Sequence, residues 1–307
     1  MNVDTIYYKQ VQLLVRVLPL IATEDCFALK GGTAINLFVR NMPRLSVDID
    51  LVYLPMDDRK SALEKIRAAL TRISQLIEKA IPQAHVQNAH EQSNALRLIV
   101  EQKGVRIKIE LSPVIRGTVF GEKILPITKM AAEHFGYVEF PVVSLPDLYA
   151  GKIAAALDRQ HPRDLYDVKF LFENEGFTDD FRKTFLVYLI SHQRPMAELL
   201  KPNFKELKEV YENEFVQMTA HKITLEELIE TRKRLVEIIH ETMTSEEKQF
   251  LLSFKSLKPD WTLLGLENVE AISQLPSVRW KIINLEKLDG KKRKEAFDKL
   301  KKILRID

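Results

Sequence analysis

Two aspartates on alternate residues of an apolar segment are the residues of this chain best suited to chemistry. Asp48 and Asp50 stand among Val47, Ile49 and Leu51, so a strand with a period of two places both carboxylates on one face. Two close carboxylates repel each other unless a cation lies between them, and hard oxygen ligands suit Mg²⁺. The pattern therefore predicts a divalent-metal site on a strand.

A glycine-rich turn precedes this strand. Gly31 and Gly32 come directly before Thr33, and glycine leaves backbone N–H groups accessible because it has no Cβ. The helix that we expect over residues 33–39 would add the positive end of its dipole, which favours phosphate. Either motif alone is common, since two glycines usually mark only a turn. Together they indicate phosphoryl or nucleotidyl transfer, where catalysis rests on positioning and charge neutralisation.

A third carboxylate is predicted on a neighbouring strand. The stretch 95–111 has the pattern of a β-hairpin that turns at Lys103-Gly104, and Glu110 lies on the polar side of its second strand. If that strand pairs with the strand of the two aspartates, Glu110 completes a three-carboxylate site. The alternative is a surface glutamate in an ion pair with a basic residue of its own strand.

Two consecutive helices are expected further along the chain. Lys152 and Arg159 are seven residues apart, so they share one helix face, and the small residues between them would let the helix lie close to the sheet or to a triphosphate. Pro162 is suited to begin the next helix. On that helix Arg163 and Asp167 have the spacing of a surface ion pair, which is the plain alternative to a functional role.

Composition excludes several classes of protein. The chain has 307 residues, of which 46% are hydrophobic and 29% are charged, as in soluble globular proteins. It has no apolar run near the roughly 20 residues that cross a bilayer, and its N-terminus does not resemble a secretion signal. The single cysteine excludes an internal disulfide, and no Cys/His cluster has zinc spacing. We therefore expect a cytoplasmic protein with no membrane partner.

The pattern favours an α+β protein of two domains. Residues 1–175 are expected to form a mixed sheet flanked by helices that carries the active site, and residues 176–307 a helical domain with a basic tail. Capping boxes open helices at Thr224 and Thr244, and another helix is expected over 204–215.

Residues 281–307 hold ten Lys or Arg against five Asp or Glu, a net charge of +5 in a chain whose total is +3. This basic tail is either the solvated face of a terminal helix or a contact for RNA phosphates. The aromatic residues of this region are interpreted as core. The alternative for Trp280, which lies beside Arg279, is a face that meets nucleic acid.

These motifs resemble the AbiEii/AbiGii nucleotidyltransferase toxin family, which has the polymerase-beta type of nucleotidyltransferase fold. The resemblance rests on the glycine turn, the aspartate strand and a second signature that runs from Lys152 to Asp167. It implies catalytic, nucleotide-binding and metal-binding roles. The implied catalytic residues are Asp48, Asp50, Lys152 and Asp167; the nucleotide-binding residues are Gly31, Gly32, Thr33, Ser46, Lys152, Arg163 and Asp164; the metal ligands are Asp48, Asp50 and Glu110.

The resemblance also implies a reaction and its partners. It implies transfer of a nucleoside monophosphate from an NTP to an acceptor hydroxyl, with Mg²⁺ or Mn²⁺ as cofactor and pyrophosphate as the leaving group. The expected acceptor is the 3′ end of tRNA, and the expected setting is an abortive-infection or type IV-like toxin–antitoxin pair with an antitoxin encoded nearby. A protein or small-molecule acceptor, or a non-catalytic nucleotide- or partner-binding module on the same fold, are the alternatives. Intact Asp48, Asp50 and Lys152 argue against the non-catalytic module.

Overall fold

The computed structural model describes residues 3–88, 96–219 and 222–306. The chain forms two compact units. The first, here the sheet unit, comprises Met1–Ser144 and Val216–Lys222; the second, here the helical unit, comprises Leu145–Phe215 and Ile223–Asp307. The division after Ser144 differs from the boundary at residue 175 that we expected, because the helices over 145–175 pack with later helices.

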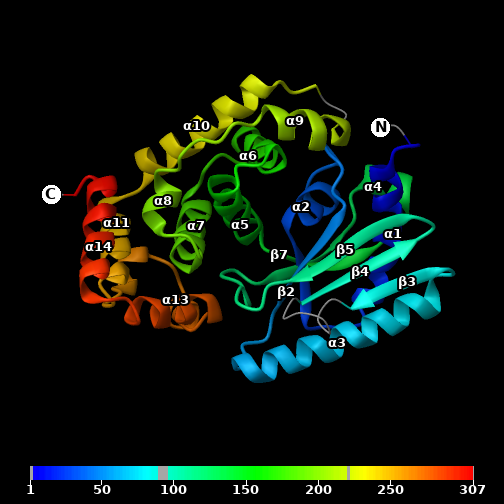
Figure 1. The fold of residues 1–307 in the computed structure, drawn as a ribbon, viewed down its shortest axis with the longest axis horizontal. Helices are drawn as coiled ribbons and strands as arrows, with labels where there is room; N and C mark the ends of the chain where they lie inside the picture. Colours follow the sequence, from blue (N-terminus) through cyan, green and yellow to red (C-terminus); the bar gives the residue numbers. More distant parts are fainter. Residues whose placement is uncertain (1–2, 89–95, 220–221, 307) are drawn as a thin grey trace. The chain divides into compact units, whose positions relative to one another are not determined.

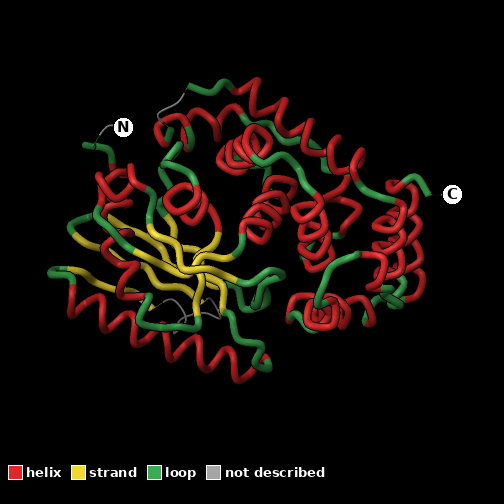
Figure 2. The backbone as a smooth tube through the Cα atoms, turned by 180° about the vertical axis from the view of Figure 1, so that it is seen from behind, coloured by secondary structure: helices red, strands yellow, loops and turns green. Residues whose placement is uncertain are grey.

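The sheet unit is built on one mixed seven-stranded sheet of order β3-β4-β5-β2-β1-β7-β6. The pairs β2–β5 and β1–β7 are parallel and the other neighbours are antiparallel. Figure 1 shows the sheet with its helices, and Figure 2 shows the same strands from behind. The structure confirms the predicted mixed sheet with flanking helices. The elements of this unit are α1 (Ile6–Ile21), β1 (Phe27–Lys30), α2 (Gly31–Thr33), the π-helix η1 (Ala34–Val39), β2 (Asp48–Tyr53), α3 (Arg59–Ala80), β3 (Ala84–Asn88), β4 (Leu96–Gln102), β5 (Val105–Leu111), β6 (Glu122–Pro126), α4 (Lys129–Phe135), β7 (Glu139–Val143) and the 3-10 turn η2 (Val216–Met218).

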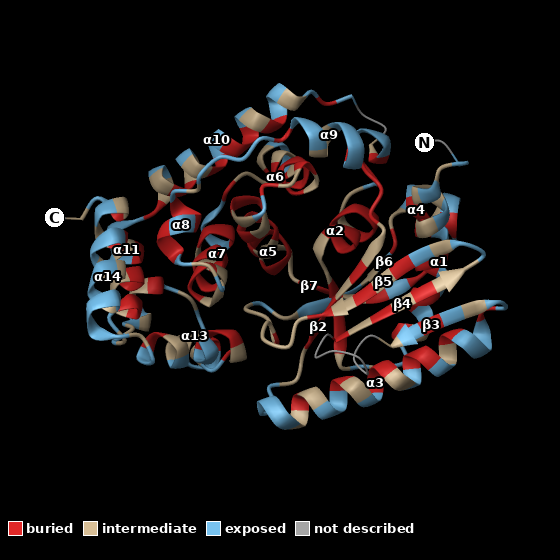
Figure 3. Cartoon of the chain, in the orientation of Figure 1, coloured by how far each residue is buried: buried red, intermediate tan, exposed pale blue. Residues whose placement is uncertain are grey.

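Apolar stripes on α1 and α3 form the core of this unit with the sheet. Leu14 and Leu18 of α1 and Leu70 of α3 are completely buried, and these helices contact β5 and β4 respectively. Along β5 the side chains alternate between buried and partly exposed, which is visible as alternating colours in Figure 3. The polar side chains of β5 therefore lie on the other face from its buried ones.

The β4–β5 hairpin turns where the sequence predicts. Lys103 has φ 51° and Gly104 has φ 78°, and positive φ at both central residues matches the right-handed twist of the strands. This turn sets the register of the hairpin, in which Arg97 of β4 lies opposite Glu110 of β5.

The helical unit has no strand among its described residues. The capping boxes at Thr224 and Thr244 are present, each closed by a glutamate three residues later, which confirms both predicted helix starts. The helix expected over 204–215 is shorter in the structure, where α9 covers Lys208–Glu214 and the preceding Lys205 N–H donates to the side chain of Gln160. The elements are α5 (Leu145–Asp158), α6 (Pro162–Asn174), α7 (Asp179–Ser191), α8 (Met196–Leu200), α9 (Lys208–Glu214), α10 (Leu225–Thr242), α11 (Ser245–Lys255), the 3-10 helix η3 (Trp261–Leu264), α12 (Val269–Ser273), α13 (Pro276–Glu286) and α14 (Gly290–Leu304).

Helix α5 is the centre of the first half of this unit. It contacts α6 and α7, and a Cβ on its Gly151 would lie 3.4 Å from the ring of Tyr188 on α7. The small residues of α5 thus make room for a neighbouring helix, whereas the sequence suggested the sheet or a triphosphate. In the part of the chain that the structure describes, every helix is too short or too polar to cross a membrane.

Candidate active site

The glycine turn lies directly against the aspartate strand. Gly31 follows β1 with φ 73°, a conformation that favours glycine. A Cβ on Gly31 would lie 2.5 Å from Oδ2 of Asp50, which is closer than real Cβ contacts allow. Glycine is therefore required here both by the backbone and by the close approach of a carboxylate.

Gly32 is enclosed from another side. A Cβ at this position would lie 2.7 Å from Nη2 of Arg44 and 2.8 Å from Oγ of Ser46, and both of those side chains are buried. The absence of a Cβ thus lets Asp50 approach Gly31 closely and lets Arg44 approach Gly32 closely. Ser46, which the family resemblance places among the nucleotide-binding residues, is buried and packs against Gly32 and Thr33 of the turn.

The Thr33 side chain ties the turn to the start of β2. Its hydroxyl is completely buried, donates to the backbone oxygen of Asp48 at 2.5 Å and lies 3.0 Å from Oγ of Ser46. The following helix differs from the expected α-helix, since Ala34–Val39 is a π-helix in which the Arg40 N–H donates to the Ile35 carbonyl. Such single-turn π segments are frequent at functional sites.

The carboxylates are brought together by strand register. Strand β2 is parallel to β5 with Asp50 opposite Glu110, and antiparallel to β1 with Asp50 opposite Lys30. Glu110 therefore lies beside the aspartate pair on the same face, as the sequence predicted.

Glu110 also makes the ion pair of the alternative interpretation, with Lys108 of its own strand, and a second one with Arg97 of β4. Its carboxylate lies 3.1 Å from Nζ of Lys108 and 3.6 Å from a guanidinium nitrogen of Arg97. Among the described residues, no three Asp, Glu, His or Cys side chains are gathered closely enough to hold a metal. The donor set nevertheless suits a hard divalent cation, since two partly exposed carboxylates stand on one face beside a turn that a Cβ would fill.

The second predicted group of residues forms a buried ion-pair cluster between α5 and α6. Nζ of Lys152 lies 2.8 Å from Asp164 and 3.0 Å from Asp167, and at most 5% of each side chain is exposed. Arg159 adds two parallel hydrogen bonds to Asp164 while its own side chain stays 62% exposed. The structure thus brings Lys152, Asp164 and Asp167 together and places Asp167 against the lysine.

The neighbouring positive charges determine the pKa of Asp164. Burial alone would raise the pKa of Asp164, but the positive charges of Lys152 and Arg159 outweigh it and hold that pKa well below its usual range. Next to the cluster, Nδ1 of His161 accepts the Arg163 N–H and caps α6, and burial lowers the pKa of His161. His161 is therefore part of the helix edge.

The C-terminal helices carry the basic tail and a pocket. Helix α14 buries Leu300 and Leu304 and exposes most of its lysines, as both interpretations of the basic tail require. Trp261 packs on Phe250 and Phe254 but stays partly exposed. Trp280 is 40% exposed, so the core interpretation is wrong for Trp280 and holds only in part for Trp261.

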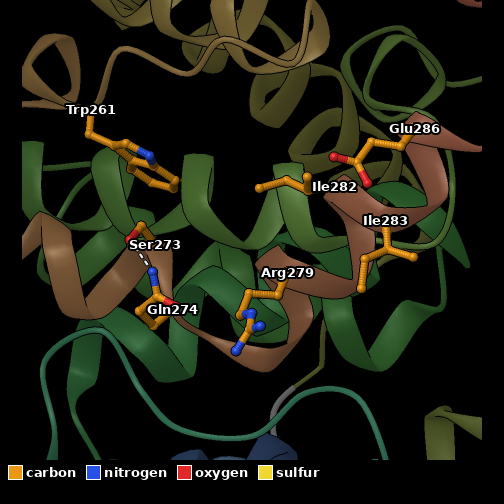
Figure 4. Close-up of a pocket in the computed structure, with 7 residues that line it drawn as sticks. All are labelled: Trp261, Ser273, Gln274, Arg279, Ile282, Ile283 and Glu286. Atoms are coloured by element: carbon orange, nitrogen blue, oxygen red, sulfur yellow. Dashed lines mark hydrogen bonds between the residues drawn. The ribbon is translucent and has the colours of Figure 1, made fainter.

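An open pocket of about 390 Å³ lies along α13, between that helix and residues of η3 and α12 (Figure 4). Its wall combines the indole of Trp261, the Ser273–Gln274 hydrogen bond of 3.2 Å and the Arg279 side chain.

Sequence reasoning gave no role to two basic residues that the structure places at the glycine turn. Lys30 of β1 lies opposite Asp50 of the adjacent strand β2, and the guanidinium of Arg44 lies against Gly32. Lys30 directly precedes the two glycines and Arg44 lies two residues before Ser46, and these positions were the available signal. The sequence also gave no sign that Thr219 would pair with Arg44.

Comparison with known proteins identifies the family and a solved structure of similar fold. The model of the family described as "Nucleotidyl transferase AbiEii toxin, Type IV TA system" matches residues 12–282. Among solved structures, the chain is similar in fold to MenT4, a nucleotidyltransferase toxin from Mycobacterium tuberculosis H37Rv, with 14% sequence identity, a TM-score of 0.60, and coverage of 98% of this chain and 95% of MenT4. No curated protein sequence matches. Because the family match extends over nearly the whole chain, this protein belongs to the AbiEii family of nucleotidyltransferase toxins from type IV toxin–antitoxin systems.

Proposed function

We propose that this toxin transfers a nucleoside monophosphate from an NTP to a hydroxyl of RNA, with the 3′ end of tRNA as acceptor, in a reaction that requires Mg²⁺ or Mn²⁺. The observation that carries the proposal is the contact between the Gly31–Gly32 turn and the strand of Asp48 and Asp50. It combines a place for phosphate oxygens with a place for the cation that accompanies them.

Each part of the turn and strand has a proposed task. Asp48 and Asp50 would hold the cation, with Glu110 as a third ligand once it leaves Lys108; the cation would neutralise charge on the triphosphate. The backbone N–H groups of Gly31, Gly32 and Thr33 would bind phosphate oxygens, since the Thr33 hydroxyl is already engaged.

The reaction itself is a displacement at phosphorus. The acceptor hydroxyl forms a bond to the α-phosphorus as the bond from that phosphorus to the bridging oxygen breaks, and pyrophosphate leaves. The hydroxyl proton passes to a carboxylate, for which Asp50 and Glu110 are the candidates by position.

The second signature has a supporting role in this proposal. Lys152 is enclosed by Asp164 and Asp167, so we propose that these three residues hold α5 and α6 together, whereas the family resemblance suggests a phosphate contact for Lys152. Arg163 and the exposed Arg159 are the basic residues of this region with access to a ligand.

Charge supports RNA as the acceptor. The exposed lysines of α14 give residues 281–307 a net charge of +5, and fixed positive charge of this kind contributes salt-dependent binding to phosphates. Family membership implies an antitoxin partner; we propose that it is encoded nearby and that the pair acts in the cytoplasm as an abortive-infection system.

The test is incubation with each labelled NTP, Mg²⁺ and total tRNA. We expect label in RNA for the wild type, none for Asp48→Asn or Asp50→Asn, and unchanged labelling for the control Asp25→Asn, an exposed aspartate outside the site. Label in the protein alone would replace RNA by a protein acceptor. Absence of any labelled product would favour a nucleotide-binding module.

A further inference from the structure

Arg44 is a buried arginine in direct contact with the glycine turn. Arg44 is 2% exposed, and its Nη1 donates to the Leu45 carbonyl at 2.8 Å. A Cβ built on Gly32 would lie 2.7 Å from Nη2 of Arg44. The guanidinium therefore fills the space that the missing side chain of Gly32 leaves.

The backbone of Arg44 is anchored as well. Arg44 forms an antiparallel bridge with Thr219, and the Leu45 N–H donates to the Met218 carbonyl at 2.7 Å. With the backbone paired on one side and the guanidinium enclosed on the other, Arg44 is held in one position relative to Gly32.

A guanidinium remains charged under all ordinary conditions. Its charge acts over a longer range in a protein interior than in water, because the effective dielectric constant there is lower. A fixed positive charge in contact with the turn thus stabilises an anion bound at the turn, and the stabilisation grows with the charge of that anion.

We propose that Arg44 is a positioning residue for the donor nucleotide, whose buried guanidinium holds the Gly31–Gly32 turn and makes it prefer triphosphates over monophosphates. This inference rests on the proposed function, because it takes the turn to be the phosphate site. It adds to that function a reason why the site binds triphosphates more tightly than monophosphates.

The experiment measures binding by titration calorimetry with Mg²⁺, using inorganic triphosphate, each of the four NTPs and the matching NMPs. The variants are Arg44→Met, which removes the charge with little change of volume, and Arg44→Lys, which retains it. Arg116→Met is the matched control, since Arg116 is a second buried arginine of the sheet unit whose Nη1 binds a backbone carbonyl, that of Asp57.

For Arg44→Met we expect triphosphate affinity to fall about 10- to 100-fold, the usual range for a lost interaction with a charged group, and monophosphate affinity to fall less than about threefold. Arg44→Lys should recover part of the loss, and Arg116→Met should bind as the wild type. In transfer assays the loss should appear in KM for the NTP more than in kcat.

Gly32→Ala tests the same contact with the arginine retained. The new Cβ must displace Nη2 of Arg44 and Oγ of Ser46, so triphosphate affinity should fall at least as far as in Arg44→Met. This variant keeps the inference testable if Arg44→Met does not fold, as judged by its thermal transition.

Three results would overturn the inference: folded Arg44→Met that binds triphosphate like the wild type, equal losses for triphosphate and monophosphate, or Gly32→Ala with wild-type binding. These are separate from failure of the proposed function, which would appear as a wild-type protein that binds triphosphate and labels no acceptor.

Discussion

Replacing Lys152 by methionine distinguishes an architectural role of the second signature from a phosphate-binding role. The ammonium lies within 3.0 Å of both Asp164 and Asp167, and all three side chains are almost fully buried. Removing one partner of such a cluster leaves an uncompensated charge and costs about 3–5 kcal/mol. Because Arg159 would still neutralise Asp164, we expect a loss near the lower end, about 3 kcal/mol.

Tryptophan fluorescence is the suitable probe in a urea titration. The only two tryptophans of the chain, Trp261 and Trp280, belong to the helical unit, so their signal reports unfolding of that unit. With a denaturant slope of about 2–3 kcal/mol per molar, the urea midpoint should fall by about 1–1.5 M.

Lys169→Met is the matched control for this experiment. Lys169 lies on α6 and also pairs with two carboxylates, those of Glu173 and Glu227, but its side chain is 26% exposed. Exposed pairs contribute about 0–1 kcal/mol, so the midpoint should hardly move. If Lys152→Met kept the wild-type midpoint while nucleotidyl transfer was lost, the architectural reasoning would be refuted and the lysine would be a phosphate ligand.

Three further predictions concern the turn and two titrating groups. Gly31→Ala should lower the free energy of unfolding by about 1–3 kcal/mol because of the positive φ at this position, and it should abolish transfer because the new Cβ displaces Asp50. Gly104 has a positive φ too but no atom near its Cβ position, so Gly104→Ala should lower the melting temperature and leave transfer intact. Equal activity of the two variants would contradict the prediction. Because the pKa of Asp164 is lower folded than unfolded, the stability it contributes is complete above about pH 4 and is lost as the pH falls; urea midpoints between about pH 3 and 6 should show this slope in the wild type and less of it in Asp164→Asn. Burial, with a smaller effect of Lys255, lowers the pKa of Lys281 to about 8, so the unfolded chain binds more protons above that pH and the helical unit should become more stable as the pH rises toward about 10; Lys281→Met should remove this rise, and an unchanged pH profile would contradict the assignment.

Periodicity predicted the half of the site that strands build. Alternation placed Asp48 and Asp50 on one face, and the Lys103-Gly104 turn fixed the hairpin that carries Glu110, so the pairing of β2 with β5 puts Glu110 opposite Asp50 on that face. Strand patterns succeed here because each residue's side is decided by its neighbours in the sequence.

Helix packing was less accessible to the same reasoning. The i, i+4 spacing of Arg163 and Asp167 suggested a local pair, yet Asp167 pairs with Lys152 of the preceding helix. Which of several lysines a buried aspartate meets depends on how two helices cross, and that information is spread over all the side chains between them. For the same reason composition did not reveal that 145–175 packs with later helices.

The return of residues 216–219 to the sheet unit was not predictable from residue types. Its main contact is a hydrogen bond from the Leu45 N–H to the Met218 carbonyl, which any two residues could form. Thr219 adds a hydroxyl bond to the Pro43 carbonyl.

This late return sets an order of events during synthesis. Pro43 and Thr219 are 176 residues apart, and ribosomes add about 5–20 residues per second, so Thr219 is synthesised roughly 9–35 s after Pro43. By then all seven strands have been translated, since the last of them ends at Val143. A nascent or truncated chain that stops short of Thr219 therefore contains both aspartates and both glycines but lacks the segment that braces Arg44 beneath them.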